Sequence, residues 1–203
     1  MRPKISGVIL AALLLFAVWS SAQEPKGNAD PNAPQPSAQT QSSAADTSKN
    51  MESEVLSKMH QANQMEVKVA ELARSKAGDA HIRNYADLLI KDHQVADKMI
   101  QDLADKQGIA LVEPAPKSDQ EKSEMEMQKQ AMADLQSLSG AEFDRKFVEF
   151  NKQAHDMVVQ MTSTAAGQLK PGPVQMLVSR VVPILIQHDT LADHLGQRVS
   201  ARK

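Results

Sequence analysis

The sequence predicts an all-α protein whose main domain is a four-helix bundle, with a long helical crossover between the second and third main helices. Apolar and small residues recur at alternating steps of three and four along several segments, which is the spacing of one helical face. Glycine and proline signals separate these segments. No segment of strand length alternates apolar and polar residues. The helical domain is expected over residues 51–200, which is long enough to bury a core of its own.

Two helices joined by a tight turn are expected at the start of this domain. The first covers residues 51–77 and is followed by Gly78, a residue suited to end a helix. Asp79 is a candidate N-cap for the second helix, which ends at Gly108. Because so few residues separate the two helices, we expect them to form an antiparallel hairpin.

A connector and a second hairpin are expected in the rest of the domain. Ser-x-x-Glu patterns begin at Ser118 and Ser139 and predict two helix starts, one for a connector over 119–138 and one for a main helix over 140–166. A Pro-Gly-Pro turn at 171–173 precedes the last helix. A crossover of about 32 residues thus joins two tight hairpins, which is the topology of ferritin-like bundles rather than of a simple up-down-up-down bundle.

The N-terminus predicts export from the cytoplasm. Arg2 and Lys4 precede an apolar run over residues 5–19, and small residues follow at 20–22, so we interpret residues 1–22 as a signal peptide. This run is shorter than the roughly 18 to 20 residues of a membrane-spanning helix, and no later segment is apolar enough to serve as a transmembrane anchor. We therefore expect an exported protein, located in the periplasm in the first place, with a secreted or envelope-associated location as the alternatives.

The remaining composition limits the classes of function. Residues 23–50 are rich in Pro, Gln, Ser and Ala and contain no large apolar side chain, so we expect a disordered linker. The chain has no cysteine, which excludes disulfides, thiolate catalysis and cysteine-ligated metals. Without residues 1–22, the 23 Lys and Arg fall to 21 against 25 Asp and Glu, a net charge near −4. This acidic balance argues against nucleic acid as a partner, and a homo-oligomer is left open.

Each main helix interrupts its apolar seam with a residue type that binds metals. Glu66, His93 and His188 fall on the buried stripes of the first, second and last helices. His155 lies beside the stripe of the third main helix, at a boundary position. Counted from the two turns at ~1.5 Å per residue, all four side chains lie near the middle of the bundle. One carboxylate and three imidazoles predict a site for one divalent transition metal, with zinc, copper and iron as candidates.

Each of these histidines also has an aspartate next to it in the sequence. The three residues are Asp92, Asp156 and Asp189. Such carboxylates can orient imidazole rings or balance the charge of a metal. Neighbours in a helix point about 100° apart, so the same aspartates are equally compatible with a solvent-facing position.

A structural interpretation competes with the metal site. A single histidine on an apolar face is more often a hydrogen-bonded core residue, and a buried polar layer can fix helix register. His60, His81 and His194 lie off the seams and are expected at the surface. No phosphate-binding glycine loop, G-x-S-x-G or H-E-x-x-H motif is present, so the sequence gives no support to ordinary hydrolase or nucleotide chemistry. A binding or interaction protein is favoured, and an enzymatic activity is left open.

Short motifs in the main helices carry a family resemblance. They are Ile82, Tyr85-Ala86, Asp92-His93 and Ala96, then Leu138-Ser139-Gly140, Phe143-Asp144 and Phe147, and finally Pro183, Leu185 and His188. Over about residues 52–198 the chain resembles exported ferritin-like proteins grouped as the domain of unknown function 4142 family. The resemblance implies an envelope location and a ferritin-like bundle, and it implies no established activity. It also implies recurrent polar positions at Glu66, Asp92, His93, His155 and His188.

This chain departs from the family pattern at one position. The family usually has Asp immediately before the histidine of the third main helix, whereas this chain has Ala154-His155-Asp156. The chain also lacks the Glu-x-x-His pairs of di-iron bundles, so neither ferroxidase activity nor iron storage is expected. Two functions remain: a metal-binding envelope protein in metal homeostasis or stress, and a helical interaction or stress protein whose polar layer is structural.

Overall fold

The computed structural model describes residues 38–113, 115–116 and 118–201. The expected signal peptide and the part of the expected linker before residue 38 lie outside the described residues. Within the described part of the chain, every regular element is a helix. The elements are α1 (Ala38–Lys76), α2 (Ala80–Gln107), α3 (Asp119–Ser137), α4 (Gly140–Gln168) and α5 (Pro173–Ser200). The all-α prediction is confirmed.

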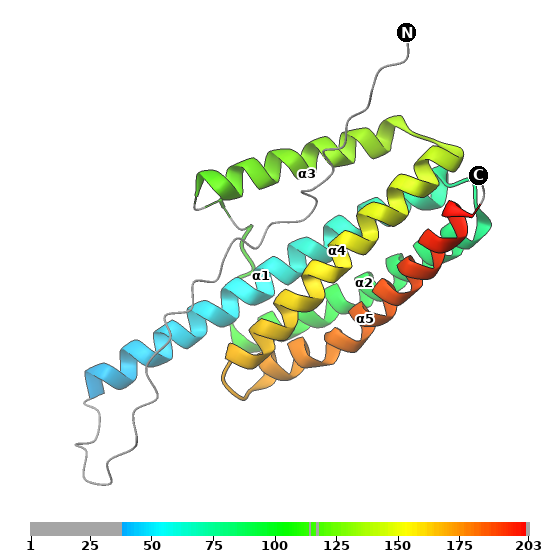
Figure 1. The fold of residues 1–203 in the computed structure, drawn as a ribbon. Helices are drawn as coiled ribbons and strands as arrows, with labels where there is room; N and C mark the ends of the chain where they lie inside the picture. Colours follow the sequence, from blue (N-terminus) through cyan, green and yellow to red (C-terminus); the bar gives the residue numbers. More distant parts are fainter. Residues whose placement is uncertain (1–37, 114, 117, 202–203) are drawn as a thin grey trace, which may run out of the picture.

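Four long helices form the bundle, and α3 is the crossover (Figure 1). α1 packs along α2, and α4 packs along α5, so the two expected hairpins are present. The hairpins meet through contacts of α1 with α4 and of α2 with α5. α3 lies along the outside of the bundle and contacts α4. No helix in the described ranges is both long and apolar enough to cross a bilayer.

Most of the expected helix ends are present. The side chain of Asp79 accepts a hydrogen bond from the amide of His81 at the start of α2. Gly108 ends α2 in the left-handed region, at φ 63°. Two details were wrong: Ser139 begins α4 without a side-chain capping bond, and α4 continues through Gly167 to Gln168.

α1 begins 13 residues earlier than residue 51, at Ala38. The last part of the segment expected as a disordered linker, residues 38–50, is therefore helical. Ala, Gln and Ser allow a helix to continue, and no proline follows Pro36 in this segment. Asp46 and Lys49 are exposed, as expected for a helical extension without large apolar side chains. Composition thus did not exclude a helix in this segment.

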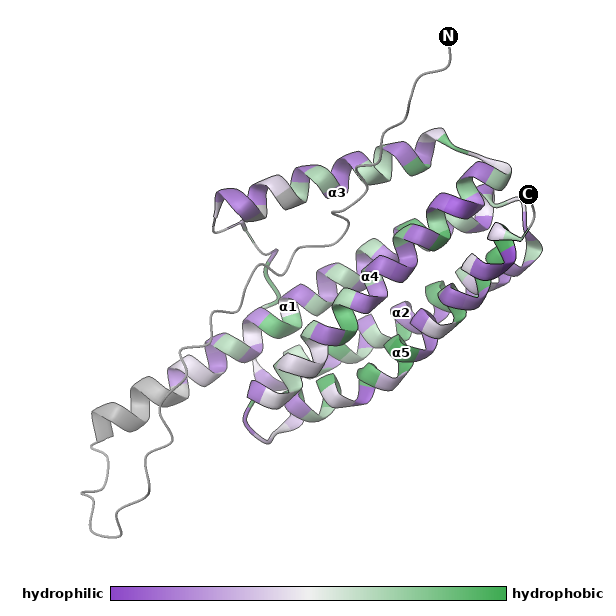
Figure 2. Ribbon diagram, viewed as in Figure 1, coloured by the Kyte–Doolittle hydropathy of each residue, from purple (hydrophilic) through white to green (hydrophobic). Residues whose placement is uncertain are grey.

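The core consists of two apolar clusters, one toward each end of the bundle. The first includes Leu89 and Phe147 and lies toward the α1–α2 turn. The second includes Ile100 and Val178 and lies toward the α4–α5 turn. Figure 2 shows hydrophobic and hydrophilic residues alternating along each long helix, which is the pattern of amphipathic helices around a shared core. A layer of buried polar side chains lies between the two clusters.

A buried carboxylate ties the two hairpins together at one end. Asp144 accepts hydrogen bonds from the backbone amides of Gly78 and Asp79, each at 2.9 Å. Asp79 in turn accepts a bond from Arg198 Nε at 3.1 Å. A Cβ atom on Gly78 would lie 3.2 Å from the Cα atom of Gly140, so this close approach favours glycine. The Phe-Asp motif at the start of α4 therefore has a structural role.

Candidate metal centre

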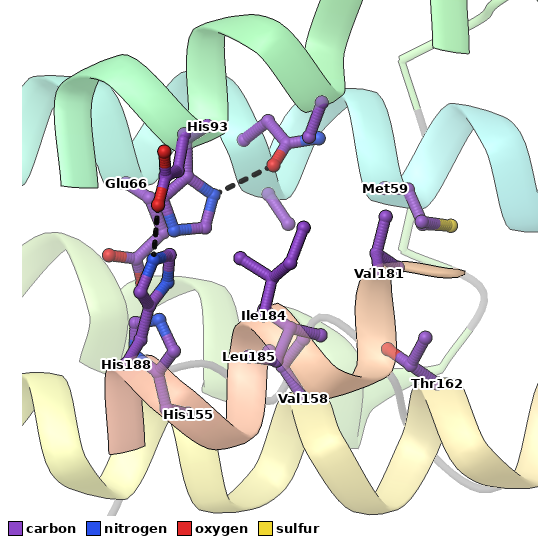
Figure 3. A pocket seen from close by; sticks show the side chains of 14 residues that line it. Met59, Glu66, His93, His155, Val158, Thr162, Val181, Ile184, Leu185 and His188 are labelled. Carbon is purple, nitrogen blue, oxygen red and sulfur yellow. Dashed lines mark hydrogen bonds and ion pairs between the residues drawn. The ribbon is translucent and has the colours of Figure 1, made fainter. Parts of the chain in front are cut away.

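Three histidines from three helices converge in the polar layer (Figure 3). α2 supplies His93, α4 supplies His155 and α5 supplies His188, with exposed fractions of 5%, 2% and 1%. Their ring centroids are separated by 5.2 to 5.8 Å. One ligand atom from each ring lies within 4.8 Å of the other two. Among the described residues, these three form the group that could hold a metal ion.

Each imidazole uses one nitrogen to contact an oxygen of the surrounding protein. The contacts are His93 Nδ1 to Asn63 Oδ1 at 2.8 Å, His155 Nδ1 to the Asn151 carbonyl at 3.0 Å, and His188 Nε2 to Asp92 Oδ2 at 3.1 Å. Carbonyl and carboxylate oxygens accept, so these ring nitrogens carry the proton and donate. The other nitrogens are buried and have no partner within the described part of the chain: His93 Nε2, His155 Nε2 and His188 Nδ1. Each is therefore left with a lone pair.

The surroundings keep the three rings neutral. Burial lowers the pKa of His93 well below its usual value, and the neighbouring rings of His155 and His188 lower it further. Burial also lowers the pKa of His155 and of His188, although Glu66 opposes this effect at the former and Asp92 at the latter. Neutral imidazole is the form that binds metals.

Glu66 is buried beside the histidines but is not part of their group. Its carboxylate lines the same pocket, and Oε2 accepts a bond from Asn151 Nδ2 at 3.2 Å. Burial raises its pKa, while the neighbouring His155 and the hydrogen bond from Asn151 oppose the increase. The structure thus places Glu66 at the expected level and gives its carboxylate a hydrogen-bonding partner from α4.

Asn151 connects several members of the polar layer, and the sequence interpretation did not single it out. Its Oδ1 accepts a hydrogen bond from the Tyr85 hydroxyl, which also lies 3.0 Å from the backbone oxygen of His188. Asn151 is four residues after Phe147 and four before His155, so helical spacing placed it on an inward face. That spacing was the available signal.

His155 is fully buried, and the prediction of a boundary position was wrong. α4 packs against both α1 and α5, so its buried face is wider than a single apolar stripe. Asn151 and His155 extend that face, because each finds hydrogen-bonding partners inside the bundle.

The three aspartates have different surroundings. Asp92 contacts His188, on the opposite hairpin, rather than its sequence neighbour. Asp156 is exposed and pairs with Lys152 at 3.1 Å, so its expected role beside the histidines was wrong. Asp189 is half-buried and contacts the same lysine at 3.3 Å. Successive residues on a helix point in different directions, which explains why adjacency in sequence did not give adjacency to a ring.

The other histidines lie outside this centre. His81 and His194 are exposed, as expected. The prediction that His60 lies at the surface was wrong: its side chain is 25% exposed, and its Nδ1 is 2.6 Å from Asp97 Oδ1. A carboxylate from α2 thus allows this histidine to pack between the helices of the first hairpin.

The histidines border a pocket of about 50 Å³. All four bundle helices line it, through Met59, Ala62, Asn63, Glu66, Asp92, His93, Ala96, His155, Val158, Thr162, Val181, Ile184, Leu185 and His188. In Figure 3 the histidines gather at one end of this set, and Met59, Thr162 and Val181 lie toward the other. The centre and the pocket therefore form one continuous site.

One comparison with known proteins gave a match. The family described as "Domain of unknown function (DUF4142)" matches residues 36–195, a range that begins close to the start of α1. No curated protein and no solved structure gave a match. The match covers the whole bundle up to the last turns of α5, together with the three histidines. The chain therefore belongs to the DUF4142 family.

Proposed function

We propose that this protein is exported to the envelope and binds one divalent transition metal through His93, His155 and His188. The observation that carries the proposal is the arrangement of the ring nitrogens. Each ring donates to an oxygen through one nitrogen, and within the described part of the chain its other nitrogen is buried without a partner. One ligand atom of each ring lies within 4.8 Å of the other two. Zinc, copper and iron all accept such imidazole ligands.

The three free nitrogens cannot satisfy one another. The proton of each neutral ring is on the nitrogen that contacts an oxygen. The three nitrogens without a partner are therefore all acceptors. A buried polar atom without a partner costs about 1–3 kcal/mol. A cation at the centre of the group satisfies three lone pairs at once, which none of the described neighbours does.

The surrounding charges also suit a cation. Asp92 contacts Nε2 of His188, and Glu66 lies in the same pocket. Nitrogen ligands around a tetrahedral ion lie about 3.4 Å apart. Ring nitrogens within 4.8 Å of one another therefore reach that geometry by small inward rotations of the side chains.

The second candidate is an interaction or stress protein in which the polar layer fixes the pairing of the helices. The hydrogen bonds from Tyr85 to Asn151 and from Asn151 to Glu66 favour it, because they connect three helices without a metal. Under this alternative, replacing His188 by Leu changes stability and removes no specific metal binding.

Support for export comes from the sequence. Arg2, Lys4 and the apolar residues 5–19 have the order of a signal peptide, and residues 20–22 suit its cleavage. A role in metal homeostasis or metal stress in the periplasm is consistent with one site per chain and with the absence of an enzymatic motif.

Metal analysis of the untagged chain without residues 1–22 tests the proposal. After exposure to zinc, copper(II) or iron(II) and dialysis, we expect about one ion per chain in the wild type. The variants His93→Ala, His155→Ala and His188→Ala should lose it. His194→Ala is the matched control, because this exposed histidine lies on the same helix as His188. Equal metal content in all five proteins, or none in any, would contradict the proposal.

A further inference from the structure

We infer that the metal centre accepts a small exogenous ligand from an apolar chamber beside the histidines. The chamber consists of the pocket side chains beyond the polar layer: Met59, Ala62, Ala96, Val158, Thr162, Val181, Ile184 and Leu185. The ligand is a molecule or ion of two or three non-hydrogen atoms, with a single donor atom and at most one charge. This inference rests on the proposed function.

The chain leaves one coordination position open. The group of ligand atoms consists of three imidazole nitrogens, whereas an ion such as zinc takes four ligands. Neither Glu66 nor Asp92 belongs to this group among the described residues. Sites with three protein ligands are typical of centres that bind an exchangeable molecule, whereas structural sites are closed by four.

Small side chains create the space for that molecule. Ala62 of α1 and Ala96 of α2 face the chamber, between the two apolar clusters of the core. Their short side chains do not fill the gap between the helices. Because the three histidines line the same pocket, a ligand on the fourth position of the metal would extend into this space.

The walls of the chamber select by charge and size. No lysine or arginine is among the side chains that line the pocket, so a multiply charged oxyanion such as phosphate has no cationic partner there. Thr162 supplies the one hydroxyl group. The volume of about 50 Å³ suits a few atoms. A ligand with no charge or one charge loses less hydration on entry.

Ile184 marks the entrance. This side chain lines the chamber and is also 39% exposed, so it lies between the chamber and solvent. Its neighbour Leu185 is buried and belongs to the inner wall. We therefore place the entry of the ligand beside this side chain, at α5.

A cobalt(II) titration tests the inference. Cobalt(II) in a tetrahedral nitrogen site absorbs visible light, and its spectrum changes when a new ligand binds. We expect azide to change the spectrum of the cobalt-loaded wild type, and phosphate at the same concentration to leave it unchanged. Ala96→Leu fills the chamber and should raise the azide concentration required about tenfold or more. Ala133→Leu on exposed α3 is the matched control and should respond like the wild type.

The possible outcomes separate the two proposals. A wild type that binds no cobalt(II) would contradict the metal centre, and the inference with it. Three results with the cobalt-loaded wild type would overturn the inference and leave the metal centre standing. Its spectrum does not change with azide, it changes equally with phosphate, or it requires the same azide concentration as Ala96→Leu. Ala62→Leu fills the chamber from α1 and replaces Ala96→Leu if circular dichroism shows that the first variant is unfolded.

Discussion

Asp92 of α2 contacts His188 of α5 across the interface between the hairpins, with 3.1 Å between Oδ2 and Nε2. The carboxylate fixes the proton of this ring on Nε2, so Nδ1, which is buried without a partner in the described part of the chain, keeps its lone pair. The side chain of Asp92 is 26% exposed, whereas that of His188 is 1% exposed. This pair therefore links solvent to the centre of the polar layer and sets the orientation of one proposed ligand.

Replacing Asp92 should weaken metal binding without abolishing it. Carboxylates that orient a ligating imidazole contribute about 10–100-fold to metal affinity. We expect a decrease of this size for Asp92→Asn in a competition titration with a chelator. Asp156→Asn is the control, because Asp156 contacts Lys152 at the surface. An equal loss of metal affinity in both variants would show that the effect comes from the net charge of the protein and not from the contact with His188.

The metal-free protein should lose stability as the pH falls below about 6.5. Burial lowers the pKa of all three histidines in the folded state, so the unfolded state binds more protons in this range. The free energy of unfolding then increases with pH up to the usual histidine value and levels off above it. Thermal melts from pH 7.5 to 5 measure this slope. His93→Phe should reduce this slope, and His194→Ala should leave it unchanged. Identical slopes in the two variants and the wild type would contradict the conclusion that the buried rings are neutral.

Glu66→Gln should have opposite effects on the metal-free and metal-bound states. Burial raises the pKa of Glu66, so its folded state favours the neutral form, and ionisation at neutral pH opposes folding. The neutral amide should therefore raise the melting temperature of the metal-free protein at pH 7.5, and the gain should shrink toward pH 4. Metal affinity should fall roughly tenfold, because a nearby negative charge is lost. A decrease in both properties would indicate that the hydrogen bond from Asn151 is the main contribution of this residue.

Asp144→Ala should destabilise the fold and leave metal binding unchanged. The substitution removes the acceptor of two backbone amides at the α1–α2 turn. Only the amide of Asp79 is buried, and leaving it unsatisfied costs about 1–3 kcal/mol. Urea denaturation measures this cost. Asp87→Ala, at an exposed position of α2, is the control. Loss of metal with unchanged stability would contradict a structural role for this motif.

A chain that begins at residue 46 should melt close to the temperature of one that begins at residue 23. Residues 23–45 contain no large apolar side chain and so add nothing to the apolar core. Residues 46 and 47, which follow directly, are exposed. Circular dichroism melts compare the two chains. A decrease of many degrees would mean that this segment packs against the bundle.

Helical periodicity accounts for the part of the site that the sequence predicted. His93 and His188 continue apolar stripes at steps of three and four, so their inward direction followed from local geometry. The hairpins followed from the turn residues Asp79 and Pro173, and the end of α2 followed from Gly108, whose preferences are also local. Helical periodicity and turn preferences were therefore sufficient for features that depend on a single helix or turn.

Contacts between helices account for the part that the sequence did not predict. His155 is buried because α4 packs against two helices, and Asp92 meets a ring 96 residues away. Asn63 and Asn151 have ordinary helical positions, and their importance depends on the side chains opposite them. Such partners depend on register and rotation between helices, which a single stripe does not specify.

The polar layer divides the core into two separately packed apolar clusters. Each cluster stabilises the turn of a different hairpin, so the histidines are the joint between two halves of one bundle. His93 belongs to the first hairpin, and the other two histidines belong to the second. An ion held by all three would cross-link the two hairpins at the level where the apolar core is interrupted, and would restrain their separation between the two clusters.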